Sequence, residues 1–356
     1  MPAGEISPPE GATFQDPLSG ANVRQLTDWR AHSHHLYFTN SGLWDAGRRL
    51  VFASHRNNRV NLYSVELATG EITQLTDFAP ADDPKLLTAF VNPVRDEAYF
   101  TWDGQVVALD LRSFRRRVLY RVPDGWRGTS LSCTADGRLV CLAVCEDLSD
   151  RIRTDFLHGY VGFAEYSAAR PLCRIVAIPT DDGEARTVDE EKFWLNRVNT
   201  SPTLADVLTF CHEGPWNKVE QRMWVLDIPS GNARPLRKQS PGERIGHEYW
   251  FADGRRVGYH GSKDGMHRFG MIEWDGGGLR EWGFPHGSTH FHSIDETLVV
   301  GDGGRDRPFV LLWRLRDGRY EGPRILAEHR GSFHVQILHV HPRMFQGLDG
   351  LSLIHI

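Results

Sequence analysis

Near its N-terminus the chain reads Leu50-Val-Phe-Ala-Ser54, then Asn61-Leu-Tyr-Ser-Val-Glu-Leu-Ala-Thr-Gly70, then Glu71-Ile-Thr-Gln-Leu-Thr76. These three stretches are rich in β-branched, aromatic and other apolar residues, and turn-forming residues separate them. The Thr69-Gly70 step between the second and third stretches is typical of a tight hairpin turn. We therefore predict an antiparallel unit of short strands.

The same unit recurs along the whole chain, and its period predicts the fold. Further copies contain Ala98–Trp102 with Val106–Leu111 and Arg117–Tyr120, Ala135–Val140, Met223–Ile228, Ala252–Val257, and Leu298–Val300 with Phe309–Trp313. The units start near Leu36, Leu87, Thr129, Trp194, Gly242, Ser288 and Ser332. Their spacing matches the roughly 40–50 residues of a four-stranded propeller blade. Because helical patterning is scarce, we predict an all-β fold, a seven-bladed β-propeller.

The unit that begins at Thr129 is longer than the others. Its extra segment, Glu146 to Ala169, is rich in charged and aromatic residues. We expect this insertion to cover the central face of the ring.

Ring closure is expected to use the N-terminus. Phe14 to Thr27 resembles the outer hairpin of a blade, and its ending Val23-Arg-Gln-Leu-Thr27 is echoed by Ile72-Thr-Gln-Leu-Thr76. We expect 14–27 to supply the closing outer strand of the blade that begins near Ser332; the alternative is a disordered leader. Residues 1–13 are expected to be a disordered leader, and 14–356 a single propeller domain.

The last blade, 332–356, is expected to be incomplete at the C-terminus, because too few residues follow His341 to finish it. The final Leu351-Ser-Leu-Ile-His-Ile356 matches what one frame of a common sequencing adapter encodes. We hypothesise that the reading frame runs into adapter sequence; the alternative is a natural short tail. His355 is therefore not treated as a ligand.

Composition excludes several classes of function. A net charge of −5 and a pI near 6.4 argue against a nucleic-acid-binding protein, and a small anionic substrate would need a local basic site. No apolar run reaches membrane-spanning length, and the N-terminus lacks the features of a secretory signal. The five cysteines form no CxxC motif and are odd in number. We therefore expect no disulfide framework, a reducing compartment and a cytoplasmic location.

Histidines near the C-terminus predict a metal site. In Gln336-Ile-Leu-His339-Val-His341, strand alternation places His339 and His341 on one face, and Gln336 could add a carbonyl oxygen. His290-Phe-His292 has the same spacing. Such nitrogen-rich ligands suit Mn²⁺, Fe²⁺, Ni²⁺ or Zn²⁺ rather than Ca²⁺ or Mg²⁺. The alternative is a histidine-rich surface strand.

The position of the histidines within the repeat favours the metal. His247, His290, His339 and His341 all fall where the innermost strands of three successive blades begin. Inner strands line the central channel, so these side chains can meet at one point.

An ordered set of motifs resembles the oligogalacturonate lyase family. It consists of Phe210-Cys-His-Glu-Gly-Pro215, Arg222-Met-Trp224, His247-Glu-Tyr-Trp250, His290 upstream of Val300-Gly-Asp302, and Gln336 with His339 and His341. The similarity extends from Phe14 to Pro342. It implies a cytoplasmic seven-bladed propeller that cleaves short oligogalacturonates, mainly unsaturated digalacturonate, by β-elimination with a divalent metal, usually Mn²⁺.

The resemblance also implies roles for individual residues. The metal ligands would be His290, Gln336, His339 and His341, with His247 as the Brønsted base and Arg222 as a cation that contacts the substrate. His212 and His292 are further candidates for contacts with the substrate or with the ligands. The chain departs from the family in a short loop after Asp302, and in Val340, where the family often has proline.

Other interpretations remain open at this point. The chain could be a non-catalytic propeller that serves as an interaction scaffold, since fold alone does not decide function. The propeller domain of a peptidase or of a translocation protein is less favoured, because no GxSxG motif follows. Arg222 could pair with Glu213 or Glu220, and Glu248 could support a ligating histidine. Trp194, Trp224, Trp250 and Trp282 are expected in the blade cores.

Overall fold

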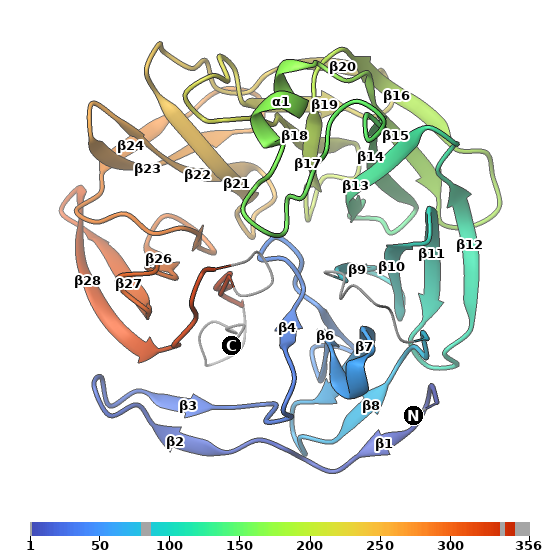
Figure 1. Cartoon of the computed structure of the whole chain (residues 1–356). Helices are drawn as coiled ribbons and strands as arrows, with labels where there is room; N and C mark the ends of the chain where they lie inside the picture. The colour runs from blue at the N-terminus through green and yellow to red at the C-terminus, as the bar shows by residue number, and fades with distance from the viewer. Residues whose placement is uncertain (1, 80–86, 335–338, 346–356) are drawn as a thin grey trace.

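The strands are arranged as sheets around a central axis, as a computed structural model of residues 2–79, 87–334 and 339–345 shows (Figure 1). The first sheet contains the sequence that predicted the fold, because the three quoted stretches form β6, β7 and β8. Its strands are β4 (Ser33–His35), β6 (Arg49–Ser54), β7 (Asn61–Glu66) and β8 (Ile72–Gln74), with β5 (Leu43–Trp44) beside β6 and β1 (Ile6–Ser7) beside β8.

Five further sheets follow, each with four antiparallel strands in sequence order. They are β9 (Ala89–Val91), β10 (Glu97–Trp102), β11 (Gln105–Asp110) and β12 (Arg116–Arg121); β13 (Trp126–Cys133), β14 (Leu139–Glu146), β15 (Cys173–Pro179) and β16 (Arg186–Glu191); β17 (Leu195–Thr200), β18 (Val207–His212), β19 (Met223–Asp227) and β20 (Asn232–Pro235); β21 (Arg244–Trp250), β22 (Arg256–Lys263), β23 (Met266–Glu273) and β24 (Arg280–Gly283); and β25 (Phe291–His292), β26 (Leu298–Gly301), β27 (Phe309–Arg316) and β28 (Arg319–Glu328).

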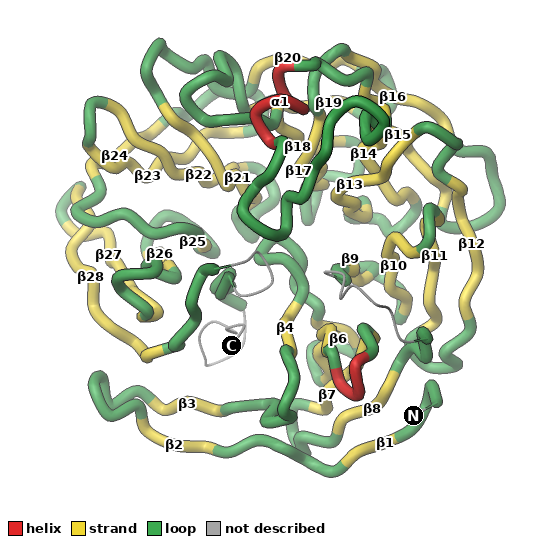
Figure 2. Tube along the Cα trace, viewed as in Figure 1, coloured by secondary structure: helices red, strands yellow, loops and turns green. Residues whose placement is uncertain are grey.

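The predicted β-propeller is confirmed. The first six predicted unit starts lie within three residues of the strands that begin the six sheets, which are the blades of the propeller. Helix is scarce: Figure 2 shows the described helical segments as α1 (Phe163–Ala168) and the short 3₁₀ turn Arg56–Asn58.

The core lies between neighbouring blades rather than at the centre of the ring. One apolar cluster joins Val51 and Leu62 of the first blade to Phe100 and Leu109 of the second. Both faces of each blade are therefore covered, which explains why middle strands such as β6 and β14 are almost continuously buried instead of alternating. This packing fixes the angles at which the innermost strands meet.

The N-terminal hairpin lies in the gap between the sixth blade and the first (Figure 1). β2 (Thr13–Gln15) pairs with β3 (Asn22–Arg24). Asp16 Oδ2 accepts a hydrogen bond from the backbone N–H of Glu328, 3.0 Å away, and Ser19 Oγ donates to the carbonyl of Leu326. The hairpin is thus anchored to β28 at the seventh blade position. Residues 335–338 and 346–356 lie outside the described residues, so its pairing with the last blade stays a prediction.

One sequence-based expectation is wrong in part. The leader 1–13 is not disordered throughout, because Ile6 and Ser7 form β1 and pair with Thr73 and Ile72. The cysteines, for which no disulfide framework was expected, form one disulfide between Cys145 and Cys173, which lie opposite each other on β14 and β15, while Cys133, Cys141 and Cys211 are free and buried. The cytoplasmic location stays a prediction.

The insertion from Glu146 to Ala169 forms α1 and a loop that passes in front of β17 toward the centre of the ring (Figure 1). Phe156, Phe163 and Tyr166 pack on Trp194 at ring-centroid distances of 4.9–5.0 Å. Trp194, Trp250 and Trp282 are buried and Trp224 packs against a blade core, as expected. None of the described helices is long and apolar enough to cross a membrane.

Candidate metal centre and active site

Three histidines from two parts of the chain meet at the start of the innermost strands. One ring nitrogen from each of His290, His339 and His341 lies within 4.8 Å of the others. The ring of His290 is 4.1 Å from that of His341 and 5.5 Å from that of His339, centroid to centroid. The predicted cluster is therefore present, and three converging imidazoles are a suitable ligand set for a divalent transition metal.

Asp302 orients the first of these ligands. Its carboxylate is fully buried, and Oδ2 lies 2.6 Å from Nδ1 of His290 while Oδ1 accepts the backbone N–H of the same residue at 2.8 Å. Burial would raise the pKa of Asp302, but His290 and these hydrogen bonds lower it overall. A carboxylate hydrogen-bonded to Nδ1 of a histidine fixes its tautomer and leaves Nε2 available to coordinate a metal.

The environment of His339 is a second observation that favours a metal at this cluster. Nδ1 of His339 is buried and has no hydrogen-bond partner among the described residues. Burial, followed by repulsion from His290, lowers the pKa of His339 to about 4, so its imidazole is neutral at pH 7. A neutral imidazole is the form that coordinates a metal. Gln336, the fourth predicted ligand, lies outside the described residues.

Phe38, in the turn after β4, forms an apolar wall of this centre. Its ring stacks on His341 at 6.2 Å and lies 5.9 Å from His290 and 6.2 Å from His247. Neighbouring Tyr37 lies 5.0 Å from His341. An apolar wall excludes water and strengthens electrostatic interactions within the centre.

His247 lies beside the triad, as predicted. Its ring is 4.5 Å from that of His290. The strand β21 bulges there, between Gly246 and Tyr249, and His247 takes the left-handed conformation with φ +54°. Burial, with repulsion from His290 next, holds the pKa of His247 well below its usual value. His247 is therefore neutral at pH 7, and a neutral imidazole can accept a proton.

His260 on β22 fixes the orientation of His247. Its Nε2 lies 2.9 Å from Nδ1 of His247, and the two rings stack. When His247 Nδ1–H donates this bond, its Nε2 carries the lone pair and faces away from His260. That tautomer is the one a base requires.

Arg222 lies in a buried ion-pair network rather than at an open surface. Its Nη1 is 2.9 Å from Glu213 Oε1 and its Nε is 3.3 Å from Glu248 Oε2. Arg222 is only 1% exposed. A substrate carboxylate could reach this guanidinium only if these contacts opened, so the structure does not support direct substrate contact by Arg222. It matches the alternative pairing with Glu213, and Glu248 belongs to the same network rather than to the surface.

Comparisons with known proteins agree with this geometry. The family model described as oligogalacturonate lyase matches residues 4–311. The chain belongs to the oligogalacturonate lyase family. The oligogalacturonate lyase of Dickeya dadantii is 27% identical, over 93% of this chain and 89% of that protein, and the oligogalacturonide lyase of Pectobacterium atrosepticum is 27% identical, over 96% and 92%.

Solved structures of the family are similar as well. An oligogalacturonate lyase in complex with manganese superposes with a TM-score of 0.84 at 26% identity, covering 96% of this chain and 92% of that one. The oligogalacturonate lyase of Vibrio parahaemolyticus gives a TM-score of 0.85 at 22% identity, covering 99% and 97%, which supports the fold.

The structure of this family member does not bring His212 or His292 into the triad. His212 stacks between Phe193 and Trp224, and its Nε2 lies 3.0 Å from Glu191 Oε2. His292 stacks on Tyr249, and its Nδ1 accepts the backbone N–H of Met344. Their predicted substrate contacts find no support in these positions.

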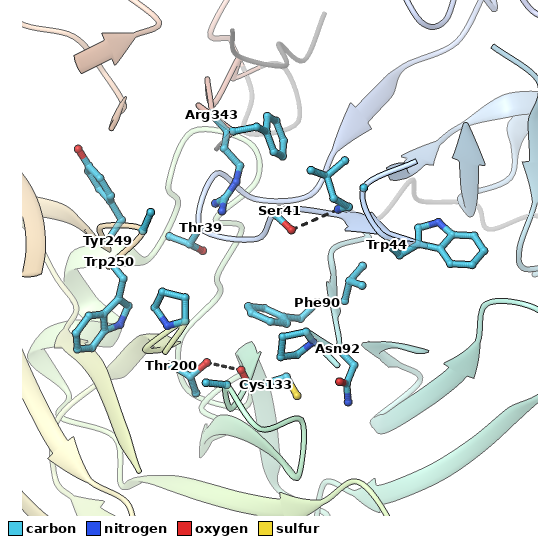
Figure 3. A pocket seen from close by; sticks show the side chains of 18 of the residues that line it. Thr39, Ser41, Trp44, Phe90, Asn92, Cys133, Thr200, Tyr249, Trp250 and Arg343 are labelled. Carbon is cyan, nitrogen blue, oxygen red and sulfur yellow. Dashed lines mark hydrogen bonds between the residues drawn. The ribbon is translucent and has the colours of Figure 1, made fainter. Parts of the chain in front are cut away.

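His292 instead lines a cavity of about 600 Å³ that lies toward the other ends of the inner strands (Figure 3). Tyr249 and Trp250 lie on one side of this cavity, and Trp44, Phe90 and Asn92 lie on the opposite side. His290, His339 and His341 are absent from its lining. The side chains of His290 and His292 therefore lie in different parts of the channel.

Sequence reasoning missed four residues of the site. Phe38 and Tyr37 come from the first blade, about 300 residues before His341, and no motif marks them. His260 follows His247 by 13 residues and faces Gly246 across the β21–β22 pair, a position that hairpin register could have predicted. Arg197, whose guanidinium lies over the ring of Tyr37 at 4.9 Å, is the fourth.

Proposed function

We propose that the chain is a metal-dependent oligogalacturonate lyase that cleaves short oligogalacturonates by β-elimination to unsaturated uronates. The observation that carries this proposal is the convergence of His290, His339 and His341 beside the neutral imidazole of His247. Membership of the family supports the same activity.

We assign the metal to His290, His339 and His341, with Gln336 as a fourth ligand from outside the described residues. Manganese is the proposed ion, because a solved structure of a similar oligogalacturonate lyase contains it. When bound, such an ion would neutralise a uronate carboxylate and stabilise the negative charge that develops next to it. Asp302 holds the His290 ring in position for this task.

His247 is the proposed base. The reaction removes the proton on the carbon α to a uronate carboxylate, and the electron pair left behind forms a double bond to C4. The C4–O bond breaks as this happens, and the leaving oxygen keeps the bonding pair and takes up a proton from water. His247 Nε2 would accept the α proton, while Nδ1–H keeps its bond to His260 Nε2. The positive charge formed on His247 is then shared with a neutral acceptor.

We propose that Arg222 acts indirectly, by holding the carboxylates of Glu213 and Glu248. This assignment replaces direct substrate binding by Arg222 with a positioning role. The substrate is a small anion and the protein carries a net charge of −5, so local cations must attract it.

The test measures the ultraviolet absorbance of the unsaturated product during incubation with digalacturonate. The purified protein is dialysed against a chelator and then supplied with Mn²⁺, and bound metal is measured independently. We expect activity to vanish on chelation and to return with about one bound ion per chain. The His339→Ala variant should bind Mn²⁺ more weakly. Undiminished product formation by metal-free protein would refute metal dependence, and absence of unsaturated product from metal-loaded protein would refute the lyase assignment.

A further inference from the structure

Two neighbouring blades carry a bulge with a left-handed residue at the same place of the innermost strand. β17 is out of register with β18 between Asn196 and Asn199, and β21 is out of register with β22 between Gly246 and Tyr249. Each bulge contains a residue in the left-handed conformation: Arg197 with φ +55° and His247 with φ +54°. Bulges redirect side chains, and strained non-glycine residues persist only where their surroundings hold them. The equivalence links Arg197 to the position of the proposed base.

The bulge at Arg197 is held by specific hydrogen bonds. The backbone N–H of Arg197 donates to Asn196 Oδ1 at 2.8 Å. The next backbone N–H, that of Val198, donates to Ser130 Oγ on β13 at 3.0 Å. Side chains from two blades therefore maintain an otherwise unfavourable conformation, as is common at functional sites.

The guanidinium of Arg197 is directed toward the metal centre. It lies over the ring of Tyr37, to whose hydroxyl its Nη1 donates a hydrogen bond. Tyr37 in turn contacts His341. One aromatic side chain thus separates this cation from the ligand triad.

Arg197 is the accessible member of the buried ion-pair network. Its Nε lies 3.4 Å from Glu213 Oε2, and Glu213 is shared with Arg222, which also pairs with Glu248. Two arginines and two glutamates balance in charge. The side chain of Arg197 is 30% exposed, whereas those of Arg222, Glu213 and Glu248 are 5% exposed or less. The network therefore presents a positive group to the solvent side.

We propose that Arg197, together with Tyr37, forms a subsite that binds the carboxylate of the uronate ring next to the ring undergoing elimination. This inference rests on the proposed function. An oligogalacturonate carries one carboxylate on each ring, so a second carboxylate accompanies the one held at the metal centre. A guanidinium matches a carboxylate with two parallel hydrogen bonds, and a phenol hydroxyl can add a third.

The experiment compares variants of Arg197 with a matched control, using the metal-loaded protein. Arg197→Met removes the charge, and Arg197→Lys keeps the charge but loses the planar fork. The control is Arg174→Met, because Arg174 is 35% exposed, pairs with Glu190 and lies over the ring of Trp126, all on the third blade and in arrangements like those of Arg197. Substrates are digalacturonate and its monomethyl ester at the ring that is not cleaved.

We expect Arg197→Met to raise KM for digalacturonate about 10- to 100-fold, the worth of a hydrogen bond to a charged group, with a much smaller change in kcat. For the monomethyl ester, wild type and Arg197→Met should have similar KM values, because the ester lacks the negative charge. Arg197→Lys should fall between wild type and Arg197→Met. Arg174→Met should change KM for either substrate less than about twofold.

The result that overturns the subsite is a KM for digalacturonate that Arg197→Met leaves within about twofold of wild type, or a loss that is equal for the ester. An unchanged circular dichroism spectrum shows that each variant is folded, and Arg197→Lys serves if Arg197→Met is not. If the wild type forms no product, the proposed function fails. Calorimetric binding of digalacturonate then still tests the subsite, because equal affinities of wild type and Arg197→Met would refute it.

Discussion

The bulges on β17 and β21 are alike in backbone and different in what holds them. At β17, Asn196 and Ser130 brace the chain by hydrogen bonds and deliver an arginine. At β21, side-chain packing holds the bulge instead. The indole of Trp216 packs so closely on Gly246 that a Cβ there would lie 2.3 Å from it, and the same indole contacts both His247 and His260. A bulge at the same position of two neighbouring blades thus directs a cation and a proton acceptor toward the same channel.

The difference has a chemical reason. The proposed base must be neutral and fixed in one tautomer, and a buried stack with His260 provides this for His247. The proposed carboxylate-binding cation must stay charged and accessible to solvent, and Arg197 is partly exposed beside Glu213. Variants that break one bulge and spare the other therefore separate the chemical step from substrate binding.

The largest effect is expected from removing the side chain that β21 delivers. His247→Ala should lower kcat by about 10²–10⁴, the usual contribution of a positioned base. Its affinity for Mn²⁺ should stay close to that of wild type, because the triad is intact. Steady-state kinetics and a metal titration measure the two quantities, with His267→Ala on the exposed part of β23 as the control. A loss of metal binding without a direct loss of kcat would make His247 a ligand.

A charged cluster centred on Arg237, between β20 and β21, should affect stability alone. Arg237 pairs with Glu243 and Glu281 at 2.9 and 2.7 Å. The hydrogen bond from Arg237 lowers the pKa of Glu243 to about 2, from 4.5 in the unfolded chain. Because the folded-state pKa is the lower one, this stabilisation is complete above about pH 5 and is lost as the pH falls toward 2.

Denaturant unfolding of wild type and Glu243→Gln between pH 7 and pH 2 measures this contribution, which is on the order of 3 kcal/mol. The variant should lose the corresponding part of the pH dependence, and its kcat and KM at pH 7 should match those of wild type. A change in kcat would show that the Arg237 cluster and the β21 bulge are coupled, and would weaken the contrast between the two regions.

Crowding the packed bulge should cost both stability and rate. In Gly246→Ala the new methyl group displaces the Trp216 indole, so we expect a loss of about 1–3 kcal/mol in the free energy of unfolding. kcat should fall because Trp216 packs on His247 and His260, while metal affinity changes little. As a control, Gly283→Ala places its methyl group in open space on β24. If Gly246→Ala and Gly283→Ala had equal unfolding free energies and equal kcat values, packing of Trp216 would not be what holds the β21 bulge.

Weakening the hydrogen-bonded bulge should have the smallest effect. Ser130→Ala removes the acceptor of the Val198 N–H, which costs about 1 kcal/mol of stability. Since Arg197 then loses part of its support, KM should rise by a small factor and kcat should hold. Ser230→Ala, in the exposed turn after β19, is the control. A fall in kcat of Ser130→Ala at constant KM would contradict the proposal that the β17 bulge affects substrate binding and the β21 bulge affects the chemical step.

The repeat made the architecture predictable, because β-rich stretches and turns recur at blade length and packing between blades makes them apolar. The positions of His247, His290, His339 and His341 were predictable for the same reason, since equivalent places in successive blades converge at the channel. The spacing of two between His290 and His292 was misleading, because side chains at different depths of the channel meet different neighbours.

Other parts could not be predicted from local pattern. A bulge breaks the alternation of a strand and leaves no residue signature, so no sequence pattern singles out Arg197. The sequence left the pairing of Arg222 open between Glu213 and Glu220, and the second partner in the structure, Glu248, comes from another blade. The Cys145–Cys173 disulfide was hidden by the insertion between its cysteines, which lengthens the connection between two adjacent strands.

One contact between the first blade and the C-terminal segment that contains His341 has a consequence for folding. His35 Nε2 hydrogen-bonds the carbonyl of His341, 306 residues away, at 2.7 Å. Contacts so distant in sequence require most of the chain to be ordered first, because closing a long loop costs conformational entropy. The half of the site that His341 supplies therefore assembles at the end of folding and is exposed to the earliest local opening. Catalytic activity should accordingly disappear on heating before the bulk of the β-structure does.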